Sequence, residues 1–118
     1  MQDAYYGPTP DAVATINRLL ALPAMGDEQD WEIELADPSK IEGMFELLAD
    51  CLLGLEERSA VALLLTHTVD ELWDDDEDTS DLEPRLHTLL ASDREVLRRM
   101  RFYWGRLQTS DAIQRALA

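Results

Sequence analysis

Five adjacent carboxylates, from Asp74 to Asp78, are the part of the chain with the clearest potential for chemistry. Asp74, Asp76 and Asp78 match the first, third and fifth positions of an EF-hand calcium loop. The sixth position holds Thr79 where that loop requires glycine, and the twelfth holds Arg85 where a bidentate glutamate belongs. We therefore exclude an EF-hand and expect only weak, nonspecific association of cations with this run.

The two histidines provide two further candidate pairs of metal ligands. His67 precedes Glu71 by four residues, and Glu83 precedes His87 by four, so each pair would share one face of a helix. Such pairs are more often ion pairs or hydrogen-bonded histidines than metal sites. One cysteine and two histidines also match no zinc spacing, and we predict neither a metal nor another cofactor.

Nucleophilic catalysis would require a general base close to Cys51 or to a serine. Cys51 falls on the apolar stripe of a predicted helix, where a free cysteine usually packs as a small hydrophobic residue. The five glycines stand far apart and form no phosphate-binding loop. No motif names a reaction, so we predict a protein that is not an enzyme.

Tyr103 and Trp104, beside Arg101 and Arg106, resemble a small patch for stacking RNA bases. At helical spacing, however, such residues more often form a core with a charged rim. The 118 residues carry a formal net charge of −15, which repels nucleic acid and anionic membranes. We therefore predict no nucleic-acid partner and no membrane partner, and a basic protein as the natural counterpart.

The length and the hydrophobic content of 46% predict one helical domain over residues 1–118, with residues 1–8 as an irregular N-terminal arm. The longest apolar run, Ala60 to Leu65, is far shorter than the roughly 20 residues of a membrane span. The first residues do not resemble a secretory signal, and a single cysteine suits a reducing compartment. We expect a cytoplasmic protein.

Apolar residues spaced three or four apart predict an all-α bundle of five to six helices. The expected helices cover about 9–22, 38–53, 56–73, 82–91 and 92–107, and a short last one follows Ser110. Thr9 before Pro10 and Asp37 before Pro38 are expected to begin the first two, and Leu107 to lie on the apolar stripe of the fifth. Gly54 is expected to end the second in a left-handed conformation, and Ser92 with Glu95 to form a capping box. The third should be the most buried, because Ala60 to Leu65 is apolar on nearly all sides.

Residues 31–36 differ from the rest because apolar and acidic side chains alternate there at period two. This pattern is typical of a strand, but the chain offers it no obvious partner strand. We expect an extended segment that lays Trp31, Ile33 and Leu35 across the helices. A strand that pairs in a dimer or with a ligand is the alternative.

Charge is distributed unevenly along the chain. Residues 1–83 hold 22 acidic and 3 basic side chains, whereas residues 84–118 hold 3 acidic and 7 basic ones. One interpretation is that the C-terminal arginines fold back and neutralise the acidic part internally; the other is that the negative field serves binding. Nine carboxylates fall within Asp70 to Glu83, and a solvated loop is the simplest explanation for them. Their density and the neighbouring tryptophan favour a site for a basic protein, formed by Asp70, Glu71, Trp73, Asp74, Asp75, Asp76, Glu77, Asp78 and Asp81.

Three short stretches carry a resemblance to a class of known proteins: residues 31–38, Glu57-Arg58 before Leu63-Leu64-Leu65, and Tyr103-Trp104 after an arginine-rich turn. Across residues 31–104 this pattern resembles small acidic helical proteins of bacterial polymorphic-toxin loci, similar in kind to immunity proteins. The resemblance implies a protein that binds and neutralises a cognate toxin domain, and it assigns no role to any single residue. The alternatives are a structural or regulatory helical protein that forms a homo-oligomer, such as a homodimer, and a DNA mimic that blocks a nucleic-acid-binding protein.

Overall fold

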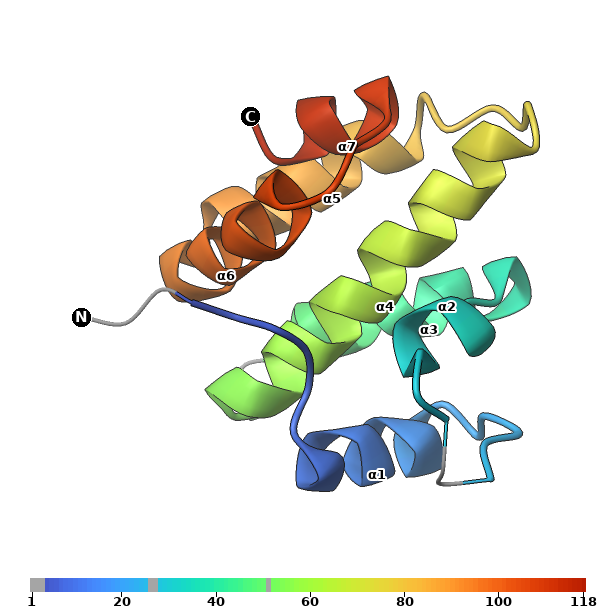
Figure 1. The fold of residues 1–118 in the computed structure, drawn as a ribbon, viewed down its shortest axis with the longest axis vertical. Helices are drawn as coiled ribbons and strands as arrows, with labels where there is room; N and C mark the ends of the chain where they lie inside the picture. Colours follow the sequence, from blue (N-terminus) through green and yellow to red (C-terminus); the bar gives the residue numbers. More distant parts are fainter. Residues whose placement is uncertain (1–3, 26–27, 51) are drawn as a thin grey trace.

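One long helix, α4 (Leu55–Asp74), crosses the molecule, and the other helices pack on its two sides (Figure 1). On one side lie α1 (Pro10–Leu19), α2 (Trp31–Glu34), the 3-10 turn η1 (Pro38–Lys40) and α3 (Ile41–Leu48). On the other side lie α5 (Leu82–Ala91), α6 (Arg94–Gly105) and α7 (Asp111–Ala116). The structure, a computed structural model, describes residues 4–25, 28–50 and 52–118, and these contain helices but no strand. The predicted all-α class is confirmed.

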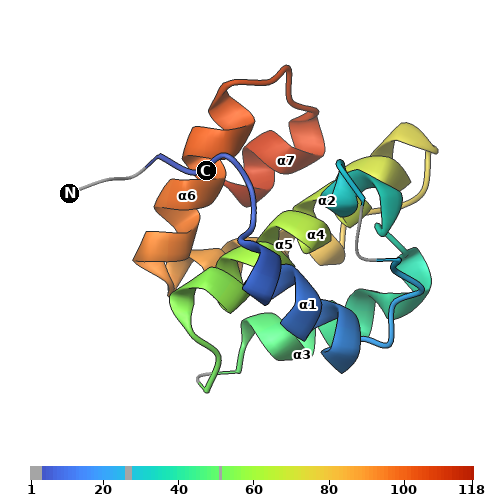
Figure 2. The ribbon, with the colours of Figure 1, turned by 60° about the horizontal axis from the view of Figure 1, so that its bottom comes forward.

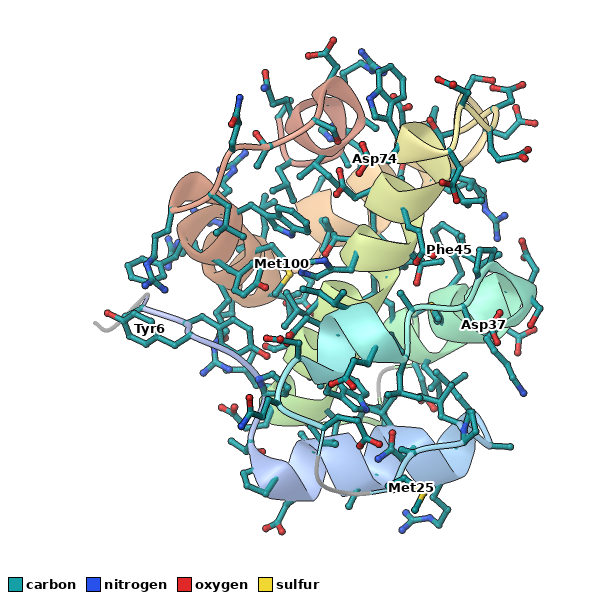
Figure 3. The ribbon with its side chains drawn as sticks, turned by 45° about the vertical axis from the view of Figure 1, so that its right-hand side comes forward. Tyr6, Met25, Asp37, Phe45, Asp74 and Met100 are labelled. Atoms are coloured by element: carbon teal, nitrogen blue, oxygen red, sulfur yellow. The ribbon has the colours of Figure 1, made fainter. Side chains whose placement is uncertain are left out.

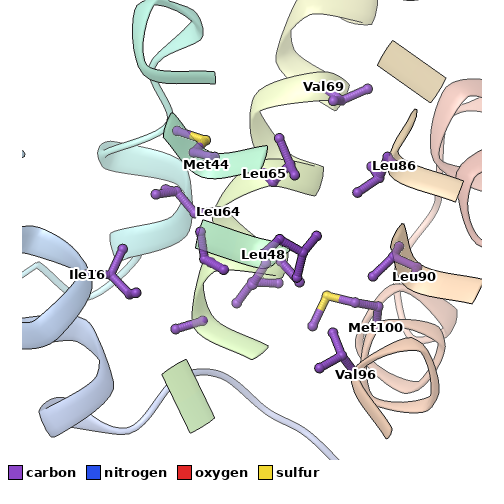
Figure 4. Close-up of a cluster of buried hydrophobic side chains, with 14 of the residues drawn as sticks. Ile16, Met44, Leu48, Leu64, Leu65, Val69, Leu86, Leu90, Val96 and Met100 are labelled. Atoms are coloured by element: carbon purple, nitrogen blue, oxygen red, sulfur yellow. The ribbon is translucent and has the colours of Figure 1, made fainter. Parts of the chain in front are cut away.

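The core forms where the middle of α4 meets helices from both sides. Every residue from Ala60 to Leu65 is fully buried, as the sequence predicts for this helix. Figure 4 shows side chains of α1, α3, α5 and α6 converging on it, among them Ile16, Met44, Leu86 and Val96. Burial of this apolar surface is the main source of stability for a domain of this size.

Two of the predicted helix starts are confirmed in atomic detail. The Thr9 hydroxyl accepts a hydrogen bond from the Ala12 amide at 3.2 Å, and Pro10 occupies the first position of α1. Asp37 likewise accepts from the Ser39 amide at 3.0 Å, and η1 then leads into α3. These capping signals are local, because each hydrogen bond joins residues no more than three positions apart.

The predicted C-terminal end of the second helix is wrong. The α3 helix stops at Leu48, Leu52 is 89% exposed, and the Asp50 carboxylate accepts from the Leu52 amide in a turn of its own. Gly54 therefore does not cap α3; its φ of −73° is an ordinary value, and it is the N-cap residue of α4. Cys51, which the sequence places on the same stripe, lies outside the described residues.

The predicted capping box of Ser92 and Glu95 is also wrong. Asp93 is the N-cap of α6 and accepts from the Val96 amide at 3.3 Å, while the Ser92 hydroxyl donates to the Leu89 carbonyl of α5. A salt bridge of 2.8 Å between Asp93 and Arg58 of α4 also holds the carboxylate at this position. A tertiary contact therefore accompanies the shift of the helix start by one residue.

The extended segment predicted at residues 31–36 is wrong, because Trp31–Glu34 forms a single helical turn. Trp31 and Leu35 are both buried, but they lie four residues apart on one helical face, and Ile33 points away with 56% of its surface exposed. The turn pairs the Leu35 amide with the Trp31 carbonyl at 2.9 Å, whereas a lone strand would leave such groups unpaired. Alternation over six residues also satisfies a four-residue spacing, so the pattern itself was ambiguous.

The N-terminal arm has no regular secondary structure over residues 4–9 and lies against α6 (Figures 2 and 3). Tyr5 is buried, and Tyr6 packs edge-on against Phe102, with the Arg106 guanidinium 4.6 Å from its ring centre. None of the helices in the described part of the chain has the length and apolar character needed to cross a membrane.

Candidate functional site

The acidic run begins on the last turns of α4 and continues into the following turn. Asp70, Glu71 and Asp74 belong to the helix, and Asp75 is its C-cap residue. Asp76 adopts a left-handed φ of 60°, which lets the Glu77 amide donate to the Leu72 carbonyl at 2.9 Å. Figure 3 shows Asp74 at this end of the helix, next to the loop where carboxylate oxygens gather. The carboxylates thus occupy the negative end of the helix dipole, which is the less favourable end for them.

The first part of the acidic run, from Asp70 to Asp75, borders a groove of about 610 Å³ between α4, α2 and the end of α6. We call it the acidic groove. Its acidic members come from successive turns of α4, and its apolar members come from α2 and from the segment after α6. The carboxylates are Asp70, Glu71, Asp74 and Asp75. The other residues that the argument uses are Ile33, His67, Trp104 and Leu107.

Two large apolar side chains of the acidic groove are exposed to solvent. Ile33 is 56% exposed, and Leu107 is 49% exposed. An apolar contact surrounded by charged groups is the usual arrangement of an interface hot spot, because the rim excludes water from the contact. The acidic groove therefore combines anchors for an apolar side chain with a rim that attracts cations.

An uncharged aromatic cluster lies beside these anchors. His67 is hydrogen-bonded through Nε2 to the Tyr103 hydroxyl at 2.9 Å, and its ring centre lies 4.5 Å from that of Trp104. Burial lowers the pKa of His67 from its ordinary 6.5 to about 4, so the ring is neutral at pH 7. The negative charge of the acidic groove is therefore not reduced by a histidinium within it.

The carboxylates of the acidic groove have no cationic partner among the described residues. The four salt bridges there join Arg58 to Asp93, Arg85 to Glu42, Arg99 to Glu56 and Arg115 to Glu83. Three arginines of the C-terminal segment thus do pair with the acidic part of the chain, as the internal interpretation expects. None of the three reaches Asp70, Glu71, Asp74 or Asp75, so the acidic groove keeps its charge.

The remaining predicted site residues lie elsewhere around the end of α4. Trp73, Glu77 and Asp78 line a second pocket of about 540 Å³. The Arg115 guanidinium lies 5.1 Å from the Trp73 ring centre, so this half-buried ring is already covered by the protein itself. Asp76 and Asp81 are exposed on the turn between α4 and α5. The structure thus divides the predicted site between the acidic groove, the second pocket and the exposed turn.

The residues considered for metal binding and for stacking on RNA bases make other contacts in the structure. The His87 Nδ1 lies 3.3 Å from the Ala116 carbonyl, and within the described ranges no three His, Cys, Asp or Glu side chains could hold a metal ion together. Trp104 is buried and donates from Nε1 to the Thr66 hydroxyl at 3.0 Å. Trp104 is therefore a core residue, as its helical spacing predicts, and Tyr103 beside it is half-buried.

Sequence reasoning missed the apolar half of the acidic groove. Ile33 was expected to face inward on an extended segment, and Leu107 on the apolar stripe of the last long helix. Asp70 lies 37 residues from either of them along the chain, so no local pattern could group the three. The density of carboxylates was the one signal available, and it located the acidic half.

No protein-family model matches the chain, and neither does any curated protein or solved structure.

Proposed function

We propose that the protein is a non-enzymatic binding protein that takes up a basic protein partner through the acidic groove. The observation that carries the proposal is a set of four carboxylates around two exposed apolar side chains, and these carboxylates have no cationic partner in the described part of the chain. Unneutralised charge of one sign accelerates encounter with a partner of the opposite sign, and the apolar contact then slows dissociation. The two halves of the groove thus serve two steps of one binding reaction.

Within this class, an immunity-type inhibitor that neutralises a basic toxin or a nuclease-like partner in the cytoplasm is our leading hypothesis. It rests on the resemblance of residues 31–104 to immunity-type proteins and on the charge of the acidic groove. A toxin that acts on nucleic acid carries a basic surface, and an acidic protein competes for that surface. A DNA mimic would need carboxylates along an extended surface, whereas those of the acidic groove gather at one end of α4.

Binding is tested with a fluorescent peptide of four Arg-Arg-Leu repeats, which offers both positive charge and apolar side chains. The groove variant combines Glu71→Gln, Asp74→Asn and Asp75→Asn. The control variant removes the same charge with Asp11→Asn, Glu46→Gln and Glu95→Gln, which are exposed on α1, α3 and α6. We expect the groove variant to lose about tenfold in affinity and the control variant less than about threefold.

Equal loss in the two variants would contradict the proposal, because the effect would then follow net charge alone. A wild-type protein that associates with itself, measured by sedimentation and abolished in the groove variant, would favour the homo-oligomer instead. The immunity role is tested by co-expressing the chain with the product of the gene next to its own. Growth restored by the wild type but not by the groove variant supports that role, and growth that stays arrested contradicts it.

A further inference from the structure

Two glutamates with the same burial have opposite surroundings in this structure. Glu32 and Glu83 are each 8% exposed. Glu83 receives hydrogen bonds from the Arg115 guanidinium and from the Thr79 hydroxyl, and these partners hold its pKa below the usual range. A buried carboxylate with such partners is the common arrangement, because burial without them is energetically costly.

Glu32 has no cation beside it in the described part of the chain. In this part of the chain, the Glu32 carboxylate accepts a hydrogen bond from its own backbone amide. Its acidic neighbours are Asp30 and Glu34. Burial and those neighbours together raise the pKa of Glu32. The Tyr5 hydroxyl, close enough to Glu32 for the two to interact electrostatically, is likewise buried without a described hydrogen-bond partner. Among the described residues, the Tyr5 hydroxyl thus lacks the hydrogen-bond partner that a buried polar group normally has, and the Glu32 carboxylate lacks a cation.

Glu32 lines a pocket of about 370 Å³ between the N-terminal arm, α1 and α2. The other walls combine apolar and aromatic residues such as Val13 and Trp31 with a second carboxylate, Glu28, and with the amides of Asn17 and Gln29. Trp31 donates from Nε1 to the Asn17 side-chain oxygen at 2.7 Å, which fixes its indole ring. This volume is near the lower limit for a small-molecule site, so it suits one small ligand or one long side chain.

We propose that this pocket binds an organic monocation, either a guanidinium or an alkylammonium group. The Glu32 carboxylate supplies the counter-charge, and the Trp31 ring supplies a surface that attracts cations, whereas the Tyr6 ring already lies against the Arg106 guanidinium. A metal ion is less suited, because Ca²⁺ requires six to eight oxygen ligands and no three acidic, histidine or cysteine side chains of the described residues come together to hold one. The cation is either a free small molecule or a side chain of the basic partner.

The second source, a side chain of the basic partner, rests on the proposed function. It is favoured because α2 lines both the pocket and the acidic groove. Trp31 and Glu32 line this pocket, whereas Ile33, the next residue, lines the acidic groove. Neighbouring residues of one short helix therefore line the pocket and the acidic groove. An arginine or lysine at the edge of that partner would reach Glu32 by extending across α2.

The first experiment titrates the ¹⁵N-labelled protein with methylguanidinium and, separately, with methylurea, which has a similar shape but no charge. The indole N–H signal of Trp31 reports on the pocket. We expect a saturable shift with methylguanidinium, little with methylurea, and an affinity about tenfold weaker in Glu32→Gln. Glu34→Gln is the matched control, since this exposed glutamate lies on the same helix, and it should bind like the wild type.

The second experiment measures binding of the Arg-Arg-Leu peptide to Glu32→Gln and Glu34→Gln. Weaker binding to Glu32→Gln alone identifies a side chain of the partner as the cation; unchanged peptide binding, with methylguanidinium still dependent on Glu32, identifies a free small molecule. A titration with methylguanidinium that does not saturate, or that is the same in Glu32→Gln, overturns the site even if the peptide binds the acidic groove. A peptide that fails to bind while methylguanidinium does would overturn the proposed function and leave the site standing.

Discussion

The two ends of α4 differ in how their charged side chains are paired. At its N-terminal end, Glu56 pairs with Arg99 at 2.9 Å, and Arg58 pairs with Asp93 at 2.8 Å while also donating to the Leu53 carbonyl. At its C-terminal end, the carboxylates of the acidic groove have no cation beside them in the described residues. The same helix thus has one end built for stability and one end that keeps a strong negative field.

The helix dipole makes acidic side chains favourable at the N-terminal end of α4 and unfavourable at its C-terminal end. Glu56 and Glu57 lie in the first turn of α4, where negative charge is stabilising. Asp74 and Asp75 lie at the last turn, where it is destabilising, and they also repel each other. The proposed binding of a basic partner would account for carboxylates at this unfavourable end of the helix.

The largest expected effect is at the paired end. Arg58→Met should lower the free energy of unfolding by about 2 kcal/mol, because it leaves the Asp93 carboxylate, only about a fifth exposed, without its cation. Urea unfolding followed by circular dichroism measures this change. A loss below about 0.5 kcal/mol would mean that the salt bridge contributes no more than a surface pair, and the two ends would then be energetically alike.

A second test uses His67, which lies on α4 one turn before the acidic end. Its folded pKa of about 4 is below its ordinary 6.5, so the unfolded chain binds a proton in this interval that the folded chain does not. The stability that neutral His67 contributes is therefore complete above about pH 6.5 and is lost as the pH falls towards 4. We expect the stability advantage of the wild type over His67→Gln to shrink by about 2 kcal/mol between pH 7 and pH 4.

The direction of that change distinguishes burial from the field of the carboxylates. If the neighbouring acidic side chains dominated, the pKa of His67 would be raised, and the advantage of the wild type would grow as the pH falls from 8 to 6. Direct titration of the His67 ring signals by NMR provides the same answer without unfolding. A midpoint above 6.5 would contradict the account.

The smallest expected effect concerns the unpaired end. Asp74→Asn together with Asp75→Asn should raise the free energy of unfolding by about 0.5 kcal/mol, because it removes negative charge from the C-terminus of the helix. The mirror-image pair, Glu56→Gln with Glu57→Gln at the N-terminus, should lower it, since Glu56 also loses Arg99. Thermal unfolding at low salt would show both. A destabilised acidic-end variant would mean that those carboxylates serve the fold.

What the sequence could predict follows from how far each feature depends on distant residues. The caps at Thr9 and Asp37 and the burial of Ala60 to Leu65 are local or depend on composition alone, and they are confirmed. The start of α6 could not be predicted, because Arg58 of another helix holds the Asp93 cap. Local capping rules have no access to that contact.

The same distinction applies to the candidate site. The carboxylates of the acidic groove are close in sequence, so their density is visible without a structure. The prediction for Ile33 was wrong because, over so short a segment, apolar residues that alternate also fit a four-residue helical spacing. In the helical turn that forms, the Ile33 side chain is exposed. Ile33 and Leu107 line the same groove because α2 and α6 both pack on α4, and no single stretch of sequence encodes that packing.

The salt dependence of the association rate tests the central claim most directly. Stopped-flow fluorescence would follow the Arg-Arg-Leu peptide binding to the wild type, the groove variant and the control variant between about 0.05 M and 0.5 M salt. Electrostatic attraction is screened within about 8 Å at physiological ionic strength and less at higher salt. We predict that the wild-type association rate falls roughly tenfold over this range, that the control variant follows it closely, and that the groove variant is slow and nearly independent of salt. A groove variant with the wild-type rate and the wild-type salt dependence would contradict the account.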